Sequence, residues 1–364
     1  MLESSVQEFA KKVLKPRLEE NDRFPWSEFF TDAVEKAVEL EYFHVSLPEE
    51  LNGWGGKLSP LNLILKSISE VDASLAAILL TNAVSQELLL SAGEAEFLRE
   101  LFGRHKPSRD LLTAYPLLMN PEENEIELSA EKTTSGYTLS GRAEYVVMAP
   151  FSRWALMPAQ VEKCQRYSFF LMDLDQKGVK SEGPVFSMGL HACPAADLIL
   201  ANAEARLIGK EDEGPELFER MVTRMLPAAA SVACGLMRGS LREAIQYARK
   251  RKQGGRNIFD WSELRLILSD MMEKANVSQI LLDHAFRAAD GRESKWAEDA
   301  CTAAIYILDA ASDLTSNGIQ ALGGYGYTKH SFQERRFRDA QHLRSVFGTM
   351  NPRRLDYVER NFNR

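Results

Sequence analysis

The chain has 364 residues, enough for two or three domains that each bury a core. Its 45% hydrophobic and 26% charged residues are typical of globular proteins. The formal net charge of −8 argues against a nucleic-acid-binding surface, which normally carries a basic excess. It leaves open an anionic ligand held by a few local cations.

The cysteines and the N-terminus indicate the cellular compartment in which the protein is expected. The four cysteines lie far apart and show no metal-ligand spacing, so we expect buried thiols in a reducing compartment and no bound metal. They are Cys164, Cys193, Cys234 and Cys301. The first residues, Met1 to Ser5, lack the basic and apolar regions of a signal peptide. The most apolar stretch, Leu61 to Leu80, is interrupted by charged residues, which argues against a membrane span. We therefore expect a cytoplasmic protein.

The first segment is expected to be helical. Apolar residues recur at helical spacing from Val6 to Val13, with charged residues on the other face. A loop rich in glycine and proline, residues 46–56, precedes two apolar segments, Leu61 to Leu80 and Val84 to Ala92. We predict an all-helical N-terminal domain over residues 1–109.

The apolar pattern changes after Leu111. Runs such as Glu125 to Ala130 alternate between apolar and polar residues, and Ser168 to Met172 is rich in residues that favour strands. Turn residues such as Ser135 and Gly136 separate these runs. Short strands at close spacing indicate an antiparallel sheet or a small barrel. We predict a middle β domain over residues 110–210.

The remainder is expected to be a helical bundle. Three long amphipathic segments cover residues 216–251, 263–291 and 293–317, and a charged run from Ser331 begins a fourth. Helices of this length with apolar stripes normally pack as an antiparallel bundle. Small residues from Ala228 to Gly235 would allow close helix contact. We predict a four-helix bundle over residues 211–364, which makes the whole chain α+β.

The most informative stretch lies near the C-terminus. A glycine-rich turn, residues 317–327, is followed by alternating cations and carboxylates over residues 333–340. Glycines at this density let the backbone approach a partner closely, and exposed amides on such a turn can bind a phosphate or another anion. The simpler interpretation is a loop between helices followed by a solvated charged helix.

The order and length of this stretch resemble the C-terminal signature of the acyl-CoA dehydrogenase family. The similarity runs from Gln320 to Tyr327 and continues over residues 334–340, and a second similarity lies in Pro48 to Leu51 with residues 70–75. The resemblance covers nearly the whole chain and implies the family's helical, β and helical-bundle architecture. It also implies an FAD between the β domain and the bundle, shared by neighbouring subunits, and an acyl-CoA thioester as substrate.

The chain departs from the family at the catalytic base. Members usually carry a glutamate just before a Gly-Thr pair, and this chain has Phe347 before Gly348 and Thr349. Some members place the glutamate on the first bundle helix, and alignment on Gly235 puts Met225 there. We therefore expect no catalytic residue at either position.

The residues implied to bind FAD are unevenly retained. Those that match the family are Arg251, Gln320, Gly323, Gly324, Thr349 and Tyr145. Arg251, Gln320 and the two glycines would reach the FAD of a neighbouring subunit. Tyr145 stands where the family has a stacking tryptophan, but Val147 cannot supply the hydroxyl that reaches the flavin. The usual Gly-Ser turn is missing from residues 113–120, and His191 is expected to be a scaffold or solvent-facing residue.

Three functions follow from the resemblance. The first is an FAD-dependent oxidoreductase of the family, which dehydrogenates the α,β bond of an acyl-CoA thioester. It would act as a homodimer or tetramer, or as the base-lacking subunit of a heterotetramer whose partner carries the glutamate. The second is a flavin-dependent monooxygenase on the same scaffold, which needs no α-proton base. The third is a non-catalytic structural or binding relative.

Overall fold

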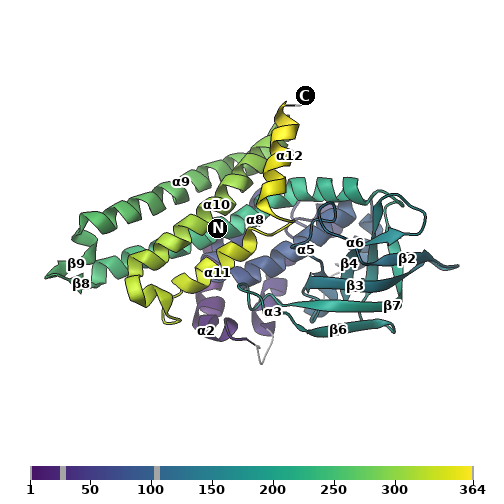
Figure 1. Cartoon of the computed structure of the whole chain (residues 1–364), viewed down its shortest axis with the longest axis horizontal. Helices are drawn as coiled ribbons and strands as arrows, with labels where there is room; N and C mark the ends of the chain where they lie inside the picture. The colour runs from purple at the N-terminus through teal and green to yellow at the C-terminus, as the bar shows by residue number, and fades with distance from the viewer. Residues whose placement is uncertain (1, 25–29, 102–106, 363–364) are drawn as a thin grey trace.

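A computed structural model describes residues 2–24, 30–101 and 107–362 of the chain. Figure 1 shows a β domain at one end, long helices that extend away from it, and the N-terminal helices packed beneath both. The N-terminal α-helices are α1 (Leu2–Phe9), α2 (Leu18–Asn21), α3 (Thr31–Glu39), α4 (Leu58–Ser69), α5 (Ala73–Ser91), α6 (Ala95–Leu101) and α7 (Ser108–Leu111).

The two apolar segments expected to be helical, Leu61 to Leu80 and Val84 to Ala92, are divided at the wrong place. The chain breaks between α4 and α5, and α5 then runs without interruption to Ser91. The carboxylate of Asp72 accepts hydrogen bonds from the backbone N–H groups of Ser74 (2.8 Å) and Leu75 (3.4 Å), and so caps the start of α5. Among the described helices, only α5 is long and apolar enough to cross a membrane by length and composition. However, 94% of that apolar window is buried inside the structure, as in a core helix.

The middle segment forms a small, nearly closed sheet. Its strands are β1 (Thr113–Ala114), β2 (Ser129–Lys132), β3 (Tyr137–Val147), β4 (Trp154–Val161), β5 (Tyr167–Asp173), β6 (Val179–Pro184) and β7 (Ala195–Ile208). The strand order is β1-β4-β2-β3-β7-β5, with β6 paired to β7, and β4 also pairs with β5. That last pairing closes five of the strands into a barrel around a separate apolar core that includes Leu139, Phe170 and Leu198. Most pairs are antiparallel as predicted, but β4 runs parallel to both β1 and β2.

The C-terminal segment is a bundle of long helices. These are α8 (Gly214–Lys250), α9 (Ser262–Asp290), α10 (Trp296–Leu322), α11 (Gln333–Leu343) and α12 (Met350–Phe362), with a hairpin of β8 (Lys252–Gln253) and β9 (Arg256–Asn257) between α8 and α9. The small residues of α8 pack inside the chain: a Cβ on Gly235 would lie 2.2 Å from the Lys66 carbonyl oxygen on α4. They hold the bundle against the N-terminal helices and are not available to a second subunit.

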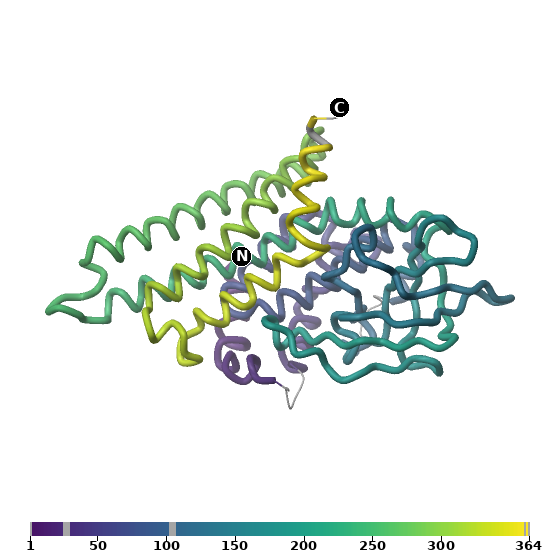
Figure 2. The backbone as a smooth tube through the Cα atoms, in the orientation of Figure 1, coloured from purple at the N-terminus to yellow at the C-terminus, as the bar shows by residue number. Residues whose placement is uncertain are grey.

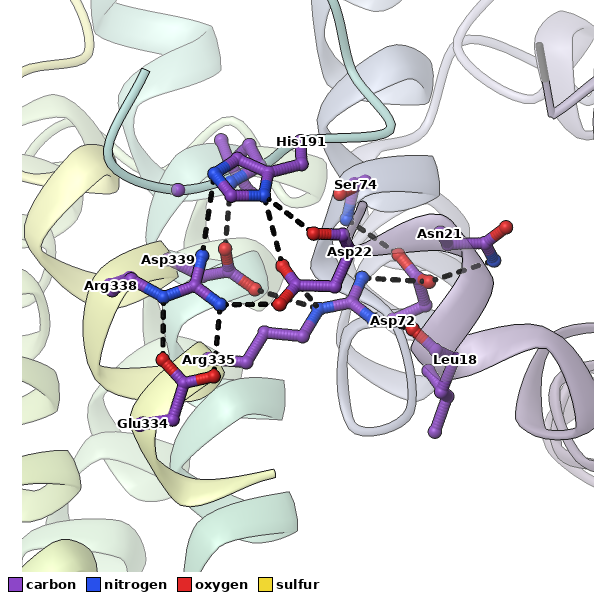
Figure 3. Close-up of polar contacts among 12 residues, drawn as sticks. Leu18, Asn21, Asp22, Asp72, Ser74, His191, Glu334, Arg335, Arg338 and Asp339 are labelled. Atoms are coloured by element: carbon purple, nitrogen blue, oxygen red, sulfur yellow. Dashed lines mark hydrogen bonds and ion pairs between the residues drawn. The ribbon is translucent and has the colours of Figure 1, made fainter. Parts of the chain in front are cut away.

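The charged run of α11 is buried, so its interpretation as a solvated helix is wrong. Arg335 is 5% exposed and Asp339 1% exposed. Arg335 binds the Asp72 carboxylate (2.9 Å), and Arg338 binds the Asp22 carboxylate (2.6 Å). Figure 3 shows these contacts, which we call the α11 charge cluster. Its members are Asp22, Asp72, His191, Arg335, Arg338 and Asp339.

The β domain joins the cluster through the loop that precedes β7. The backbone N–H of Leu190 donates to the Asp339 carboxylate at 2.7 Å. His191 lies between two acceptors: Nδ1 is 2.9 Å from the Asp22 carbonyl oxygen, and Nε2 is 3.0 Å from that of Ser187. A neutral imidazole can donate from only one nitrogen, so this arrangement favours the imidazolium. His191 is therefore a buried scaffold residue that ties the β domain to the N-terminal helices.

The electrostatics of His191 agree with this geometry. Burial disfavours its charge, but hydrogen bonds and attraction to Asp22 outweigh that penalty and raise the pKa of His191 above 6.5. Burial also disfavours the Asp22 carboxylate, yet His191, Arg335 and Arg338 hold the pKa of Asp22 well below its usual range. A raised histidine pKa stabilises the folded state fully below the unfolded pKa, and this stabilisation is lost as pH rises through the folded pKa.

We predict that His191→Gln lowers the free energy of unfolding more at pH 6 than at pH 9. The expected loss at pH 6 is roughly 1.5–3 kcal/mol, the usual range for a hydrogen bond to a charged group. Urea unfolding of both proteins at the two pH values measures it. His284→Gln is the control, because His284 pairs with Asp299 on the surface and should contribute only about 0–1 kcal/mol. An equal loss at both pH values would contradict a charged His191.

Candidate cofactor and catalytic site

The residues predicted to contact a cofactor lie in two separate places. Arg251, Gln320, Gly323 and Gly324 gather at the end of the bundle that carries the β8–β9 hairpin, and we call them the tip group. Tyr145 and Thr349 lie at the junction of the β domain and α11, which we call the sheet side. Figure 2 shows these two regions well apart along the chain's long axis. A single chain therefore does not bring the predicted residues together.

The tip group is open to solvent. Tyr247 at the end of α8 stacks on Tyr325 with ring centroids 5.6 Å apart and planes 6° apart, which brings the Arg251 segment beside the glycine turn. Gly323 has a φ of 60°, and a Cβ added to Gly323 or Gly324 would meet nothing within 4 Å. In the described part of the chain, the exposed Arg251 side chain forms no ion pair. An arginine beside bare backbone can receive an anion such as a pyrophosphate.

Phe347 and Met225 are both buried at the expected base positions. Phe347 is 3% exposed, and its ring meets Phe218 edge-on with centroids 6.5 Å apart. Its backbone N–H donates to the Leu117 carbonyl oxygen at 2.8 Å, so the loop after α11 is bonded directly to the β domain. Met225, on α8, is fully buried in the hydrophobic core. Neither side chain can accept a proton from a carbon acid.

Tyr145 is aimed by a β-bulge in β3. The register shifts between Ala143 and Val146, and Tyr145 takes a φ of 52°, which is unusual for a side chain of this size. Its backbone N–H is held by the Asp197 carboxylate at 2.9 Å. The bulge turns the ring towards His342 on α11.

The Tyr145–His342 contact crosses from the β domain to the bundle. The phenol oxygen lies 3.1 Å from His342 Nε2, and the ring centroids are 5.7 Å apart. Burial lowers the pKa of His342 to about 4, with a smaller effect from the nearby His191. Burial raises the pKa of Tyr145 to about 12, so the phenol donates to a neutral imidazole. Nothing in the sequence signalled His342, because its partner is almost 200 residues away in the chain.

The sheet side does not fit a flavin ring. The backbone N–H and C=O of Val147 are both bonded to Tyr115, at 3.0 and 3.1 Å, and its side chain is apolar and buried. The Phe347 N–H is bonded to Leu117, and Tyr145 is bonded to His342. The donors that a polar ring edge needs are thus replaced or already used. Thr349 is exposed and keeps its hydroxyl. The tip group fits the pyrophosphate of an FAD, whereas the sheet side does not fit its ring.

Two cavities of about 350 Å³ flank this junction. One lies in the β domain beside Tyr145, between Leu118, Met119 and Met157. The other, which we call the Phe347 cavity, lies between the β domain, α8, α10 and α12. Glu123 lines the second cavity, and its carboxylate oxygens lie 3.2 and 3.3 Å from the position of a Cβ on Gly348. Sequence reasoning missed this carboxylate because it belongs to a loop without a motif.

Comparisons with known proteins agree on one family. Sequence models described as acyl-CoA dehydrogenase, N-terminal domain, and acyl-CoA dehydrogenase, C-terminal domain, match residues 1–104 and 213–361, together more than half of the chain. Subunit CarC of the caffeyl-CoA reductase-Etf complex of Acetobacterium woodii is 25% identical over 365 residues, which covers 96% of this chain and 94% of CarC. The 3-(aryl)acrylate reductase of Clostridium sporogenes is 26% identical over 364 residues, covering 96% of this chain and 94% of that protein.

A solved structure shows the same fold. Butyryl-CoA dehydrogenase of Megasphaera elsdenii superposes with a TM-score of 0.89 at 19% identity, covering 100% of this chain and 97% of that one. The expected α+β fold, with helical, β and helical-bundle parts in that order, is confirmed.

We predict that the chain purified alone holds less than one FAD. After incubation with excess FAD and gel filtration, the ratio of flavin to protein absorbance should stay below one per chain. Each missing or occupied hydrogen-bond donor on the sheet side should weaken FAD binding by roughly 0.5–3 kcal/mol. One tightly held FAD per chain would contradict this account of the sheet side.

Proposed function

The chain belongs to the acyl-CoA dehydrogenase family, and from this premise we propose that it is a base-lacking subunit of a heteromeric oxidoreductase. The enzymes of this family are FAD flavoproteins. In the proposed assembly, a partner subunit carries the catalytic glutamate and the flavin ring, and the substrate is an acyl-CoA thioester.

Phe347 is the observation that carries this proposal. Dehydrogenation needs a carboxylate within about 3 Å of the α proton in a productive pose. At the expected position this chain places a buried, apolar ring whose N–H is already bonded to Leu117. Removing a general base lowers the rate typically 10²–10⁴-fold, so a substrate bound here would turn over poorly.

The contrast between the two regions supports a heteromer. The tip group keeps an exposed arginine without an ion pair among the described residues, and glycines with open space where a Cβ would lie. The sheet side has lost its donors. A subunit that lends its tip to a partner's FAD, without holding a flavin ring itself, accounts for both observations.

A non-catalytic family member is the second candidate. The Tyr145–His342 hydrogen bond and the Phe347–Leu117 hydrogen bond close the junction without any ligand, as a structural subunit would require. The monooxygenase alternative gains nothing from this geometry, because it also needs a site for the flavin ring. For either candidate we propose a soluble, cytoplasmic protein.

We predict that the isolated chain does not dehydrogenate acyl-CoA thioesters at a useful rate. A dye-reduction assay with straight-chain, branched and steroid-like CoA esters measures this. Activity should appear when a glutamate-bearing paralogue is co-expressed, and Arg251→Gln should then reduce the flavin content of the complex. Turnover by the isolated chain at the rate of ordinary family members would overturn the base-lacking reading.

We predict that the protein assembles at least as a dimer. The motivation is an apolar face on α9, where Leu266 is 72% exposed and Ile280 67% exposed. Light scattering at micromolar concentration should give a mass of two chains or more. Ile280→Asp should lower that mass, whereas Met188→Asp, in an exposed loop of the β domain, should leave it unchanged. A monomer in both the wild type and the Met188 variant would contradict this.

A further inference from the structure

The Phe347 cavity has an apolar floor and a charged lining. Its volume is about 350 Å³, equal to the liquid volume of roughly ten water molecules at about 30 Å³ each. The floor consists of Phe218, Val222, Leu226 and Phe347. The two phenylalanine rings meet edge-on there, with centroids 6.5 Å apart.

Arg353 on α12 is a buried cation at this cavity. It is 8% exposed, more than nine-tenths buried. Its guanidinium has five N–H donors, and its acceptors among the described residues are the Val346 carbonyl oxygen and the sulfur of Met350, at 3.2 Å. No carboxylate of the described residues lies within ion-pair distance of it. Burial lowers the pKa of Arg353, and the charges of Cys301, Glu123 and Asp356 only partly offset this, as expected for a buried guanidinium without a direct ion pair.

The carboxylates of the lining act on this arginine only at a distance. The other arginine, Arg166, is already neutralised by a two-point contact with Glu216, at 2.6 and 2.9 Å. Glu123 is held in place by Asn120, whose amide donates at 2.5 Å, and lies beside Gly348. Asp356 and Glu122 also line the cavity. Arg353 and these carboxylates therefore line the same cavity, and no ion pair joins them among the described residues.

We propose that the Phe347 cavity binds a small zwitterion, an amino acid whose ammonium and carboxylate groups are separated by an apolar chain. The carboxylate of the ligand would take the free donors of Arg353, and its ammonium group would lie at Glu123 and Asp356. A simple anion would meet the acidic lining, and a simple cation would leave Arg353 without a counter-ion. A molecule with both charges and an apolar body would pair with the arginine, with the carboxylates and with the apolar floor at the same time.

This inference does not depend on the proposed function, because it concerns binding to the chain without flavin or thioester. The test is isothermal titration of the full chain, in its purified assembly, with 6-aminohexanoate, hexanoate and hexylamine at neutral pH. We expect 6-aminohexanoate to bind at least about tenfold more tightly than either singly charged compound, the factor that corresponds to 1.4 kcal/mol. Equal affinities, or no binding of 6-aminohexanoate, would overturn the proposal.

Two variants separate the two ends of the ligand. Glu123→Gln keeps an oxygen for Asn120 but removes the charge, and should weaken 6-aminohexanoate and hexylamine without weakening hexanoate. Arg353→Gln removes the cation and should weaken 6-aminohexanoate and hexanoate without weakening hexylamine, and its circular dichroism spectrum and unfolding midpoint verify that it folds. Glu131→Gln, an exposed change on β2, is the matched control and should alter none of the affinities. Loss of all three affinities to the same degree in the Glu123 variant would count against the assignment of the ammonium group.

Discussion

The buried charges of α11 are the constraint on which the rest of the structure depends. Arg335 and Arg338 take their carboxylates from segments more than 250 residues earlier in the chain, and Asp339 holds the loop of the β domain. Removing one partner of a buried ion pair typically destabilises a protein by 3–5 kcal/mol, because the other charge is left bare. If α11 were displaced, several buried charges would lose their partners at once. This cost fixes the position of the helix. The loop that carries Phe347 follows α11 directly and is placed with it.

The two regions of interest therefore differ in how they are built. The sheet side is over-determined: the bulge in β3, the Tyr145–His342 contact and the Phe347–Leu117 bond each fix the same junction. The tip group lies at the far end of two long helices, where the Tyr247–Tyr325 stack and hydrogen bonds such as that from the Tyr325 hydroxyl to the His330 carbonyl oxygen hold the turn. The sheet side is closed by its own contacts, and the tip group is open to solvent. This contrast is what we expect of a subunit that contributes residues to a partner's FAD site but has no complete site of its own.

Much of the fold could be predicted, and the failures have physical causes. Helical and strand periods gave the order of the three parts, since burial of one face imposes those periods locally. Strand β4 was missed because it is buried on nearly all sides and contains Pro158, so it shows no alternation. The charged run of α11 was misread because its partners, Asp22 and Asp72, are remote in sequence, and spacing within a helix cannot reveal them. The apolar residues at the base positions were visible from the motif. In contrast, His342 is recognised only from its contact with Tyr145, and Glu123 and Arg353 only from the cavity that they line together.

The glycines of the turn after α10 differ in whether the fold itself requires a glycine at that position. A Cβ on Gly326 would lie 2.5 Å from the Ile319 carbonyl oxygen, so the chain's own packing requires a glycine there. Gly324 adopts no left-handed backbone and has empty space around it, so the isolated fold would tolerate alanine at no steric cost. Selection acting on this fold alone would leave Gly324 free to drift while holding Gly326. A requirement for glycine at position 324 could therefore come only from a surface outside the chain.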